Sequence, residues 1–435
     1  MRIETVILSE LTTSERNDLT TRSAVPDPSV REEARQIVAS IRDGGDEALA
    51  ECASRFGGGL ATRRLRVSPA QIKESLTSLP DELRHSLESA IHNIRAVHTS
   101  QRPVDSVTEP TPGVVVERRW APLRRVGVYV PGGRAAYPSS LLMGVVPAQI
   151  AGVEEIAVAT PSDGESRMSS TVLAAAAMLG VDEVFAIGGA QAIGALAYGT
   201  PSVPAVDKIV GPGGPWVTAA KLAVFGDCAI DLPAGPSEAL IVVDETADSR
   251  VAGADLLCQA EHGPESPIVL VATTEQVARA VLSAAATQVV NLERENIIRD
   301  ALTTLGLVVI ADDRDEALAF ADEWAPEHLT LHVSSPSAAA DAVPSAGSVF
   351  VGHWTPESAG DYATGANHVL PTGGQAAAYG PLSVEDFGSW RQLQTLDETG
   401  LRTLAPTIRS LAMAEGLTAH ARCVDVRLSP LLEMP

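Results

Sequence analysis

Val126-Gly-Val-Tyr-Val130, followed by Pro131-Gly132-Gly133, opens a series of short apolar runs that each end in a turn containing glycine or proline. An alanine-rich stretch with helical periodicity follows these turns, so strand, turn and helix alternate along the chain. The later runs are Ile156–Ala159 before Pro161, Val184–Ile187 before Gly188-Gly189, and Ile209-Val210 before Gly211-Pro-Gly-Gly214. Repeated units of this kind predict a parallel sheet covered by helices on both faces.

A second series begins at Ala239-Leu-Ile-Val-Val243, continues through a helix from about Val251 to Glu261, and resumes with Ile268–Val271 and Leu307–Ile310. We therefore expect an α/β protein with two tandem Rossmann-like parallel-sheet units. Residues 29–100 have helical periodicity that Gly44-Gly45 interrupts, and Ser383–Met413 also reads as helical. The predicted domains are a helical N-terminal flank (1–110), two Rossmann-like domains (111–236 and 237–375) and a helical C-terminal tail (376–435).

Composition excludes several classes of protein. The 435 residues carry 55 acidic and 32 basic side chains, a net charge of −23, which argues against nucleic acid or an anionic membrane as a partner. No apolar run reaches the roughly 18 residues that a membrane span needs. The four cysteines form no Cys-x-x-Cys pair and the N-terminus lacks the apolar core of a signal peptide, so we expect a cytoplasmic protein.

Polar side chains stand out from this apolar background in clusters that suit a metal. Gln259 and His262 are three residues apart on a predicted helix, so both project from one face and can share an ion. Together with Asp361 and His420 they offer imidazole, carboxylate and amide donors, which zinc accepts. Taken singly, each cluster is more often a hydrogen-bonded surface patch or an ordinary turn.

The glycine-rich turns have a similar ambiguity. The spacing G-x-G-x-x-G, which commonly follows the first strand of a dinucleotide fold, is absent. Three separate glycine turns are still possible pyrophosphate sites, because bare backbone amides at a helix N-terminus attract anions. Each turn alone is more often a simple connection.

The motifs taken jointly and in order are much more specific. From about residue 25 to the C-terminus the chain resembles the histidinol dehydrogenase family. The resemblance is carried by Val128-Tyr-Val-Pro-Gly-Gly133, Gly188-Gly-Ala-Gln191, Asp231-Leu-Pro-Ala-Gly-Pro-Ser237-Glu, Gln259-Ala-Glu-His262-Gly-Pro, Ala325-Pro-Glu327-His328-Leu, Ser358-Ala-Gly-Asp361-Tyr, Asn367-His-Val-Leu-Pro-Thr-Gly and Glu415-Gly-Leu-Thr-Ala-His420.

This resemblance implies oxidation of L-histidinol to L-histidine through the aldehyde, with two NAD⁺ consumed and one zinc at each site. It also implies a homodimer, in which the neighbouring subunit donates His420 and the C-terminal tail completes the site. The residues at the family's functional positions are Gln259, His262, Asp361 and His420 as zinc ligands that also contact the substrate, His328, Ser237 and Glu415 as further substrate contacts, and Tyr129 and Gln191 as NAD contacts.

Glu327 and His328, the two side chains that we expect to take part in the reaction, are adjacent in the sequence. Removal of hydride from an alcohol requires loss of the hydroxyl proton, and we assign His328 as the base that accepts it. Oxidation of the aldehyde requires addition of water, and Glu327 is our candidate to activate that water.

One position departs from the family pattern. Where relatives have Gly-Pro-Gly-Asn, this chain has Gly211-Pro-Gly-Gly214, so an amide that would contact NAD is replaced by a backbone N–H alone. We expect weaker NAD binding or compensation elsewhere. The change could also mark a paralogue that is a zinc- and NAD-dependent dehydrogenase of another small alcohol.

Two alternatives belong to other functional classes. A zinc hydrolase could use Glu327 or His328 to activate metal-bound water, but its His-Glu-x-x-His hallmark is missing. A metal-stapled scaffold protein without turnover would leave the Glu327-His328 pair without a purpose.

Overall fold

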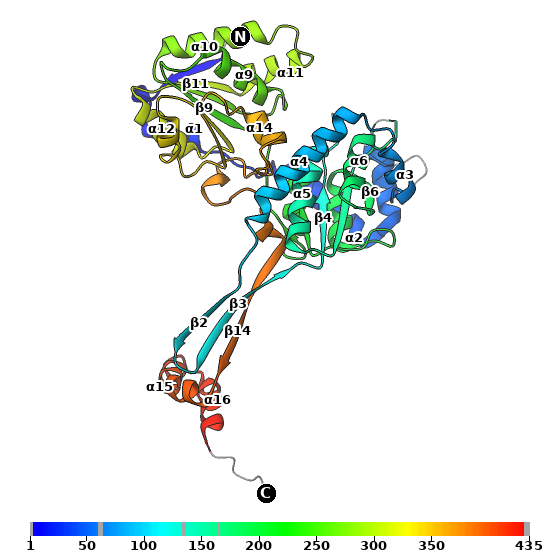
Figure 1. Cartoon of the computed structure of the whole chain (residues 1–435), viewed down its shortest axis with the longest axis vertical. Coiled ribbons are helices and arrows are strands. Elements are labelled where there is room, and N and C mark those ends of the chain that lie inside the picture. Colours follow the sequence, from blue (N-terminus) through cyan, green and yellow to red (C-terminus); the bar gives the residue numbers. More distant parts are fainter. Residues whose placement is uncertain (1–2, 60–63, 133–135, 164, 430–435) are drawn as a thin grey trace. The chain divides into compact units, whose positions relative to one another are not determined.

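A computed structural model describes residues 3–59, 64–132, 136–163 and 165–429; Gly133 of the first glycine turn lies outside them. The chain forms two compact units (Figure 1). The first comprises Met1–Gln101 and Leu123–Phe387, and the second comprises Arg102–Pro122 and Gly388–Pro435. The predicted α/β class is confirmed, because the first unit contains two parallel sheets with helices on both faces.

The first sheet has five parallel strands in the order β6-β5-β4-β7-β8. Val126 and Val128 pack against a cluster that contains α5 and α6, whereas Tyr129 packs against a cluster that contains α2, α7 and α8. The sheet is therefore buried on both faces, and so its strands read as nearly continuous apolar runs. The elements are α2 (Pro28–Phe56), α3 (Pro69–Ser75), α4 (Asp81–Thr99), β4 (Arg125–Tyr129), α5 (Pro138–Ala151), β5 (Glu155–Thr160), α6 (Ser170–Met178), β6 (Val184–Ala186), α7 (Gly189–Tyr198), β7 (Lys208–Val210), α8 (Pro215–Val224) and β8 (Ala229–Ile230).

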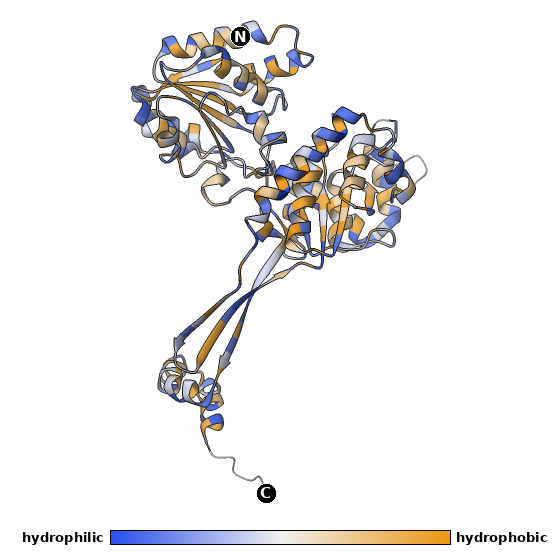
Figure 2. Cartoon of the chain, in the orientation of Figure 1, coloured by the Kyte–Doolittle hydropathy of each residue, from blue (hydrophilic) through white to orange (hydrophobic). Residues whose placement is uncertain are grey.

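The second sheet has six parallel strands in the order β1-β11-β10-β9-β12-β13. Its faces are covered by α9, α10 and α11 on one side and by α12 and α13 on the other. Both sheets appear as apolar layers between helices with polar outer faces (Figure 2). The elements are β1 (Glu4–Ile7), η1 (Leu8–Glu10), α1 (Thr13–Thr20), β9 (Ala239–Val243), α9 (Ser249–Ala260), β10 (Ile268–Ala272), α10 (Glu275–Gln288), α11 (Glu295–Thr304), β11 (Gly306–Ile310), α12 (Arg314–Trp324), β12 (His328–His332), α13 (Pro336–Ala340), β13 (Ser348–Val351), α14 (Glu357–Tyr362), η2 (Gln375–Ala377) and η3 (Val384–Phe387).

The predicted helices of residues 29–100 are present as α2, α3 and α4. The interruption at Gly44-Gly45 is also present, because Gly45 has φ +54° and breaks α2 into two helical stretches. Sequence reasoning missed β1, which lies at the start of the predicted N-terminal flank and joins the edge of the second sheet beside β11.

The second unit is a three-stranded antiparallel sheet with two helices. Its strands are β2 (Ser106–Thr111), β3 (Val114–Pro122) and β14 (Gly388–Leu396), in the order β14-β3-β2, and its helices are α15 (Glu398–Ala414) and α16 (Thr418–Leu428). The prediction of helix across Ser383–Met413 is therefore wrong for β14. Pairing with β3 along its whole length, with Trp390 packed edge-on against Trp120, overrides the helical propensity of Arg391, Gln392 and Gln394.

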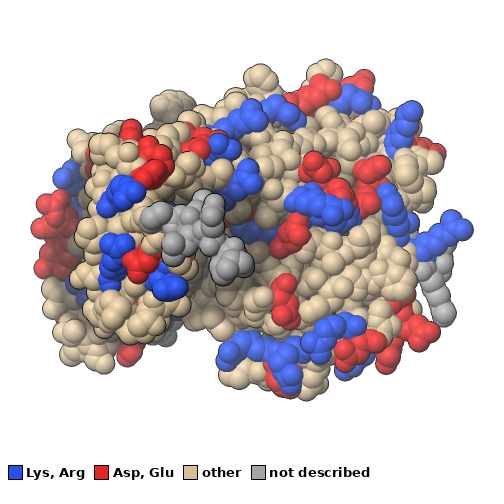
Figure 3. All heavy atoms as spheres, turned by 90° about the horizontal axis from the view of Figure 1, so that it is seen from below, with Lys and Arg blue, Asp and Glu red and all other residues tan. Residues whose placement is uncertain are grey.

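Acidic and basic side chains are interspersed over most of the surface seen in Figure 3. None of the described helices combines the length and apolarity that crossing a membrane requires.

Candidate active site

A cavity of about 260 Å³ lies where the two sheets of the first unit meet. We call it the histidine-lined cavity, because His262, His328 and His368 all contribute to its wall. Pro131 and Gly214 reach it from turns at the carboxyl ends of β4 and β7. Ligands of parallel sheets normally lie at such carboxyl ends. The second sheet instead contributes its amino ends, since Ser237 lies two residues before β9 and Glu327 lies one residue before β12.

Glu327 and His328 are buried side by side at the start of β12. Glu327 Oε2 accepts hydrogen bonds of 2.8 Å from Ser237 Oγ and from the backbone N–H of Glu238. These bonds are possible because β9 and β12 are neighbours in register, with His328 opposite Ala239. His328 Nδ1 lies 3.8 Å from Glu327 Oε2 and has no hydrogen-bond partner among the described residues.

Burial shifts the pKa of both residues of this pair. It raises the pKa of Glu327 well above its ordinary value, against the opposing effect of the Glu238 N–H. Burial also lowers the pKa of His328 to about 3, and the nearby imidazoles of His262 and His368 act in the same direction. The imidazole of His328 is therefore neutral at pH 7 and can accept a proton.

Two of the predicted zinc ligands, His262 and Asp361, line the same cavity as this pair, and a third, Gln259, lies on the helix that precedes His262. Gln259 is fully buried near the end of α9, and both polar atoms of its amide lack a hydrogen-bond partner in the described part of the chain. His262 follows that helix, and Asp361 lies on α14. Burial raises the pKa of Asp361 to about 6.

Sequence reasoning missed a further acid in this cluster, Glu357. The donor atoms of His262, Glu357 and Asp361 all lie within 4.8 Å of one another, and Glu357 Oε1 is 3.9 Å from His262 Nε2. Glu357 is fully buried, yet neither carboxylate oxygen has a hydrogen-bond partner among the residues that the structure describes. Its position four residues before Asp361 was the available signal, because residues i and i+4 share one helix face.

His368 is a second residue that was not predicted to act at the site. Its Nδ1 lies 3.0 Å from the carbonyl oxygen of Asp361 and 3.8 Å from Asp361 Oδ1. Burial lowers the pKa of His368 to about 4, so this ring is also neutral at pH 7. The neutral imidazole of His368 thus holds the segment that carries Asp361, through the contact of its Nδ1 with the Asp361 carbonyl oxygen. The feature of the sequence that pointed to His368 was its place in the motif that begins at Asn367.

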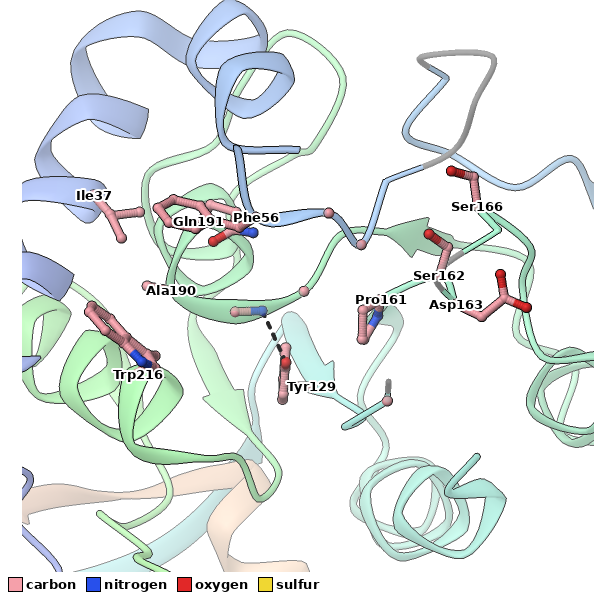
Figure 4. Close-up of a pocket in the computed structure, with 15 residues that line it drawn as sticks. Ile37, Phe56, Tyr129, Pro161, Ser162, Asp163, Ser166, Ala190, Gln191 and Trp216 are labelled. Carbon is pink, nitrogen blue, oxygen red and sulfur yellow. Dashed lines mark hydrogen bonds between the residues drawn. The ribbon is translucent and has the colours of Figure 1, made fainter. Parts of the chain in front are cut away.

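Tyr129 and Gln191, the predicted NAD contacts, line a different cavity of about 600 Å³ at the carboxyl edge of the first sheet. We call it the glycine-lined pocket. Figure 4 shows Ile37, Phe56 and Trp216 on one side of it and Ser162, Asp163 and Ser166 on the other. The backbone N–H of Gly189 donates a 3.0 Å hydrogen bond to the hydroxyl of Tyr129.

The turn before α7 requires its two glycines. A Cβ at Gly188 would lie 2.5 Å from the Cβ of Pro161, and Gly189 has φ +69°, a conformation that favours glycine. Gly188 caps α7 without a side chain, so backbone amides at this helix start can bind an anion.

Gly214 does not line the glycine-lined pocket but the histidine-lined cavity. It caps α8, and two residues further on Trp216 lines the glycine-lined pocket. Pro131 and Gly132 are likewise divided between the two cavities. Two chain segments thus border both cavities. A Cβ at Gly214 would meet no atom of the described residues within 4 Å.

Glu415 and His420 belong to the second unit, where Glu415 ends α15 and His420 lies in the first turn of α16. Both side chains are exposed within that unit. Their predicted contribution to the zinc and substrate site stays a prediction.

Comparison with known proteins gives a consistent result. The model of the family described as histidinol dehydrogenase matches residues 20–428. The chain is 48% identical to histidinol dehydrogenase of Natronomonas pharaonis over 91% of its own length and 93% of that protein. It is 40% identical to the Vibrio vulnificus (strain CMCP6) protein of the same name over 99% of both chains. The crystal structure of histidinol dehydrogenase from Elizabethkingia anophelis superposes with a TM-score of 0.92 at 36% identity, covering 98% of each chain.

Proposed function

The chain belongs to the histidinol dehydrogenase family, and we propose from this premise that it oxidises L-histidinol to L-histidine through the aldehyde, with NAD⁺ and zinc. The supporting observation is the joint arrangement of an acid–imidazole pair, a cluster of metal-type donors and an adjoining glycine-lined pocket. Relatives that share the family name over nearly the whole chain do not favour a paralogue that acts on another alcohol.

The donor set fits zinc. Gln259, His262 and Asp361 would hold the ion, with Glu357 beside them and His420 as the remaining predicted ligand. Buried polar atoms without partners are rare in proteins, and neither the amide of Gln259 nor the carboxylate of Glu357 has a hydrogen-bond partner among the described residues. A cation would satisfy these groups. Bound zinc would orient the amino alcohol and stabilise negative charge on its oxygen.

The first oxidation uses His328. Its neutral imidazole would accept the proton of the substrate hydroxyl, and bound NAD⁺ would take the hydride from the adjacent carbon, which would leave an aldehyde and NADH. Glu327 Oε2 lies 3.8 Å from His328 Nδ1. When Glu327 is ionised, its negative charge favours the protonated form of the His328 ring.

The second oxidation uses Glu327. Ionised Glu327 would accept one proton from a water molecule as that water adds to the aldehyde, which gives the hydrate anion. A second NAD⁺ would take the hydride from this anion, and the carboxylic acid that results would release its proton to become the carboxylate. Ser237 Oγ and the Glu238 N–H hold the accepting carboxylate in place.

NAD⁺ would extend from the glycine-lined pocket to the histidine-lined cavity. The amides at the start of α7 would bind the pyrophosphate, Tyr129 and Gln191 line the same pocket, and Trp216 provides an apolar surface for a ring. The start of α8, from Gly214 to Trp216, borders both cavities, which supports a route for NAD⁺ along that helix end. Gly214 would contact the nicotinamide half with its backbone alone.

We also propose a homodimer in which Glu415 and His420 of one subunit complete the site of the other. The test mixes His420→Ala chains with His328→Asn chains, each inactive alone. Restored activity after subunit exchange supports shared sites, and continued inactivity after proven exchange contradicts them.

The four cysteines are all free, as a reducing compartment would leave them, and we propose a cytoplasmic location.

The proposed reaction is tested by incubating purified protein with NAD⁺ and L-histidinol and following NADH absorbance. Two NADH per histidinol are expected. We expect His328→Asn to lose most turnover with zinc retained, and His262→Ala to lose the zinc, measured by metal analysis. Absence of NADH formation by zinc-loaded protein, or zinc loss in His328→Asn, contradicts these assignments.

A further inference from the structure

Arg22, in the segment between α1 and α2, makes a two-pronged ion pair with Glu238. Its Nη2 lies 2.7 Å from Glu238 Oε1 and its Nε lies 3.2 Å from Oε2. The side chain of Glu238 is 3% exposed and that of Arg22 is 14% exposed. A bidentate pair with this degree of burial fixes the geometry of both partners.

The same guanidinium also holds the end of α12. Arg22 Nη1 donates a 2.6 Å hydrogen bond to the carbonyl oxygen of Trp324, and the guanidinium carbon lies 3.3 Å from the centroid of the Trp324 ring. Trp324 is the last residue of α12 and stands three positions before Glu327. The intervening Ala325 has φ +49°, a strained conformation that persists only when its surroundings fix it.

Glu238 in turn contacts both residues of the reactive pair through its backbone. Its N–H donates to Glu327 Oε2 at 2.8 Å, and its carbonyl accepts from the N–H of His328 at 3.3 Å. Glu238 Oε1 also accepts a 3.1 Å hydrogen bond from the N–H of Gly373. Arg22 therefore joins the two chain segments that meet at Glu327, although Arg22 itself does not line the histidine-lined cavity.

We infer that Arg22 is a positioning residue that fixes the Glu327–His328 pair through Glu238 and Trp324. This inference rests on the proposed function, because it assigns a role toward the two oxidations. Loss of Arg22 frees the turn before His328 and leaves the Glu238 carboxylate buried without its counter-charge. A misplacement of the pair lowers turnover, whereas the glycine-lined pocket and the metal cluster are unchanged.

The experiment compares Arg22→Gln, Arg22→Lys and the double variant Arg22→Gln/Glu238→Gln with the native holoenzyme. Arg16→Gln is the matched control, because Arg16 pairs with Glu323 of α12 at 2.7 Å from the same N-terminal region, but at the surface. The measurements are kcat and KM with histidinol and with histidinal, the dissociation constant of NAD⁺, zinc content and the fraction of folded protein.

We expect Arg22→Gln to lower kcat for both substrates by about 10- to 100-fold per folded, zinc-loaded molecule, because a misplacement of about 1 Å can cost 100-fold. The dissociation constant of NAD⁺ and the zinc content stay within about twofold of the native values. Arg22→Lys recovers part of kcat, since lysine keeps the charge but not the fork. The double variant folds better than Arg22→Gln, because it removes the unpaired charge, and it keeps a lowered kcat.

Native kcat per folded molecule in Arg22→Gln overturns the inference, as does an equal loss in Arg16→Gln. If Arg22→Gln does not fold, Arg22→Lys and the double variant test the inference in its place. Native kcat in both of these variants would also overturn the inference. Failure of the proposed function is distinguishable, because native protein would then not reduce NAD⁺ with histidinol at all.

Discussion

Ser237 Oγ donates a 2.8 Å hydrogen bond to Oε2 of Glu327, from a residue 90 positions away along the chain. The bond joins the starts of two adjacent strands, β9 and β12, and it stabilises the ionised form of a carboxyl group whose pKa burial raises.

Ser237→Ala removes this donor and leaves the Glu238 N–H as the remaining partner of Oε2. A hydrogen bond to a charged group contributes about 1.5 to 3 kcal/mol, so we expect oxidation of histidinal to slow by about 10- to 100-fold. Oxidation of histidinol should slow less, because Glu327 is not its base. Ser139→Ala, in the same cavity, is the control. Equal slowing of both steps would contradict the assignment of Glu327 to the second oxidation.

Glu357→Gln should weaken zinc binding. The carboxylate lies among the metal-type donors, 3.9 Å from His262 Nε2, and groups around a bound metal typically contribute 10- to 100-fold in affinity. Competition with a chelator measures the affinity directly, without an activity assay. Glu261→Gln is the control for general electrostatic attraction, because Glu261 is an exposed acid beside His262. Equal zinc affinities in the two variants would contradict a role of Glu357 in zinc binding.

Metal-free protein should lose stability as the pH rises through the pKa of Asp361. Burial raises that pKa from 3.8 to about 6, so the folded state keeps a proton that the unfolded state releases. The resulting stabilisation is present below pH 3.8 and is lost as the pH rises through about 6. Relative to Asp361→Asn, native protein should lose roughly 3 kcal/mol of unfolding free energy between about pH 4 and pH 7.

Denaturant titrations of both proteins after removal of zinc measure this difference. With zinc present the trend should reverse, because the ion binds the ionised carboxylate. A constant difference between native protein and Asp361→Asn across this pH range would show that Asp361 is not buried in the metal-free state.

Gly214→Asn should tighten NAD⁺ binding. Within the described part of the chain, a Cβ at this position meets no atom within 4 Å, and asparagine is among the preferred caps of a helix such as α8. One added hydrogen bond contributes about 0.5 to 1.5 kcal/mol, which is roughly 2- to 13-fold in affinity. Calorimetric titration with NAD⁺ measures the affinity. Gly214→Ala is the control, because alanine fills part of the same space without adding an amide group. If Gly214→Ala gains as much, the amide is not responsible.

The parallel sheets could be predicted because buried strands leave uninterrupted apolar runs. Ala239–Val243 was predicted with both bounds as observed. The strand β14 could not be predicted, since its pairing with β3 is a long-range contact that local composition does not encode. Glu357 was overlooked for a related reason: α14 is a six-residue helix, too short for a periodic pattern to reveal a buried face. The positioning of Glu327 by Ser237 likewise depends on strand register.

The use of amino ends by the second sheet has a practical consequence for engineering. Its opposite rim, where β9, β10, β11 and β12 end near Asp244, Thr273, Asp312 and Ser334, is separated from the reacting groups by a strand of five residues, about 15 Å. Reporter peptides or immobilisation handles grafted onto those loops would sit a full strand away from the chemistry, so the enzyme could be anchored by that side with its catalytic apparatus undisturbed.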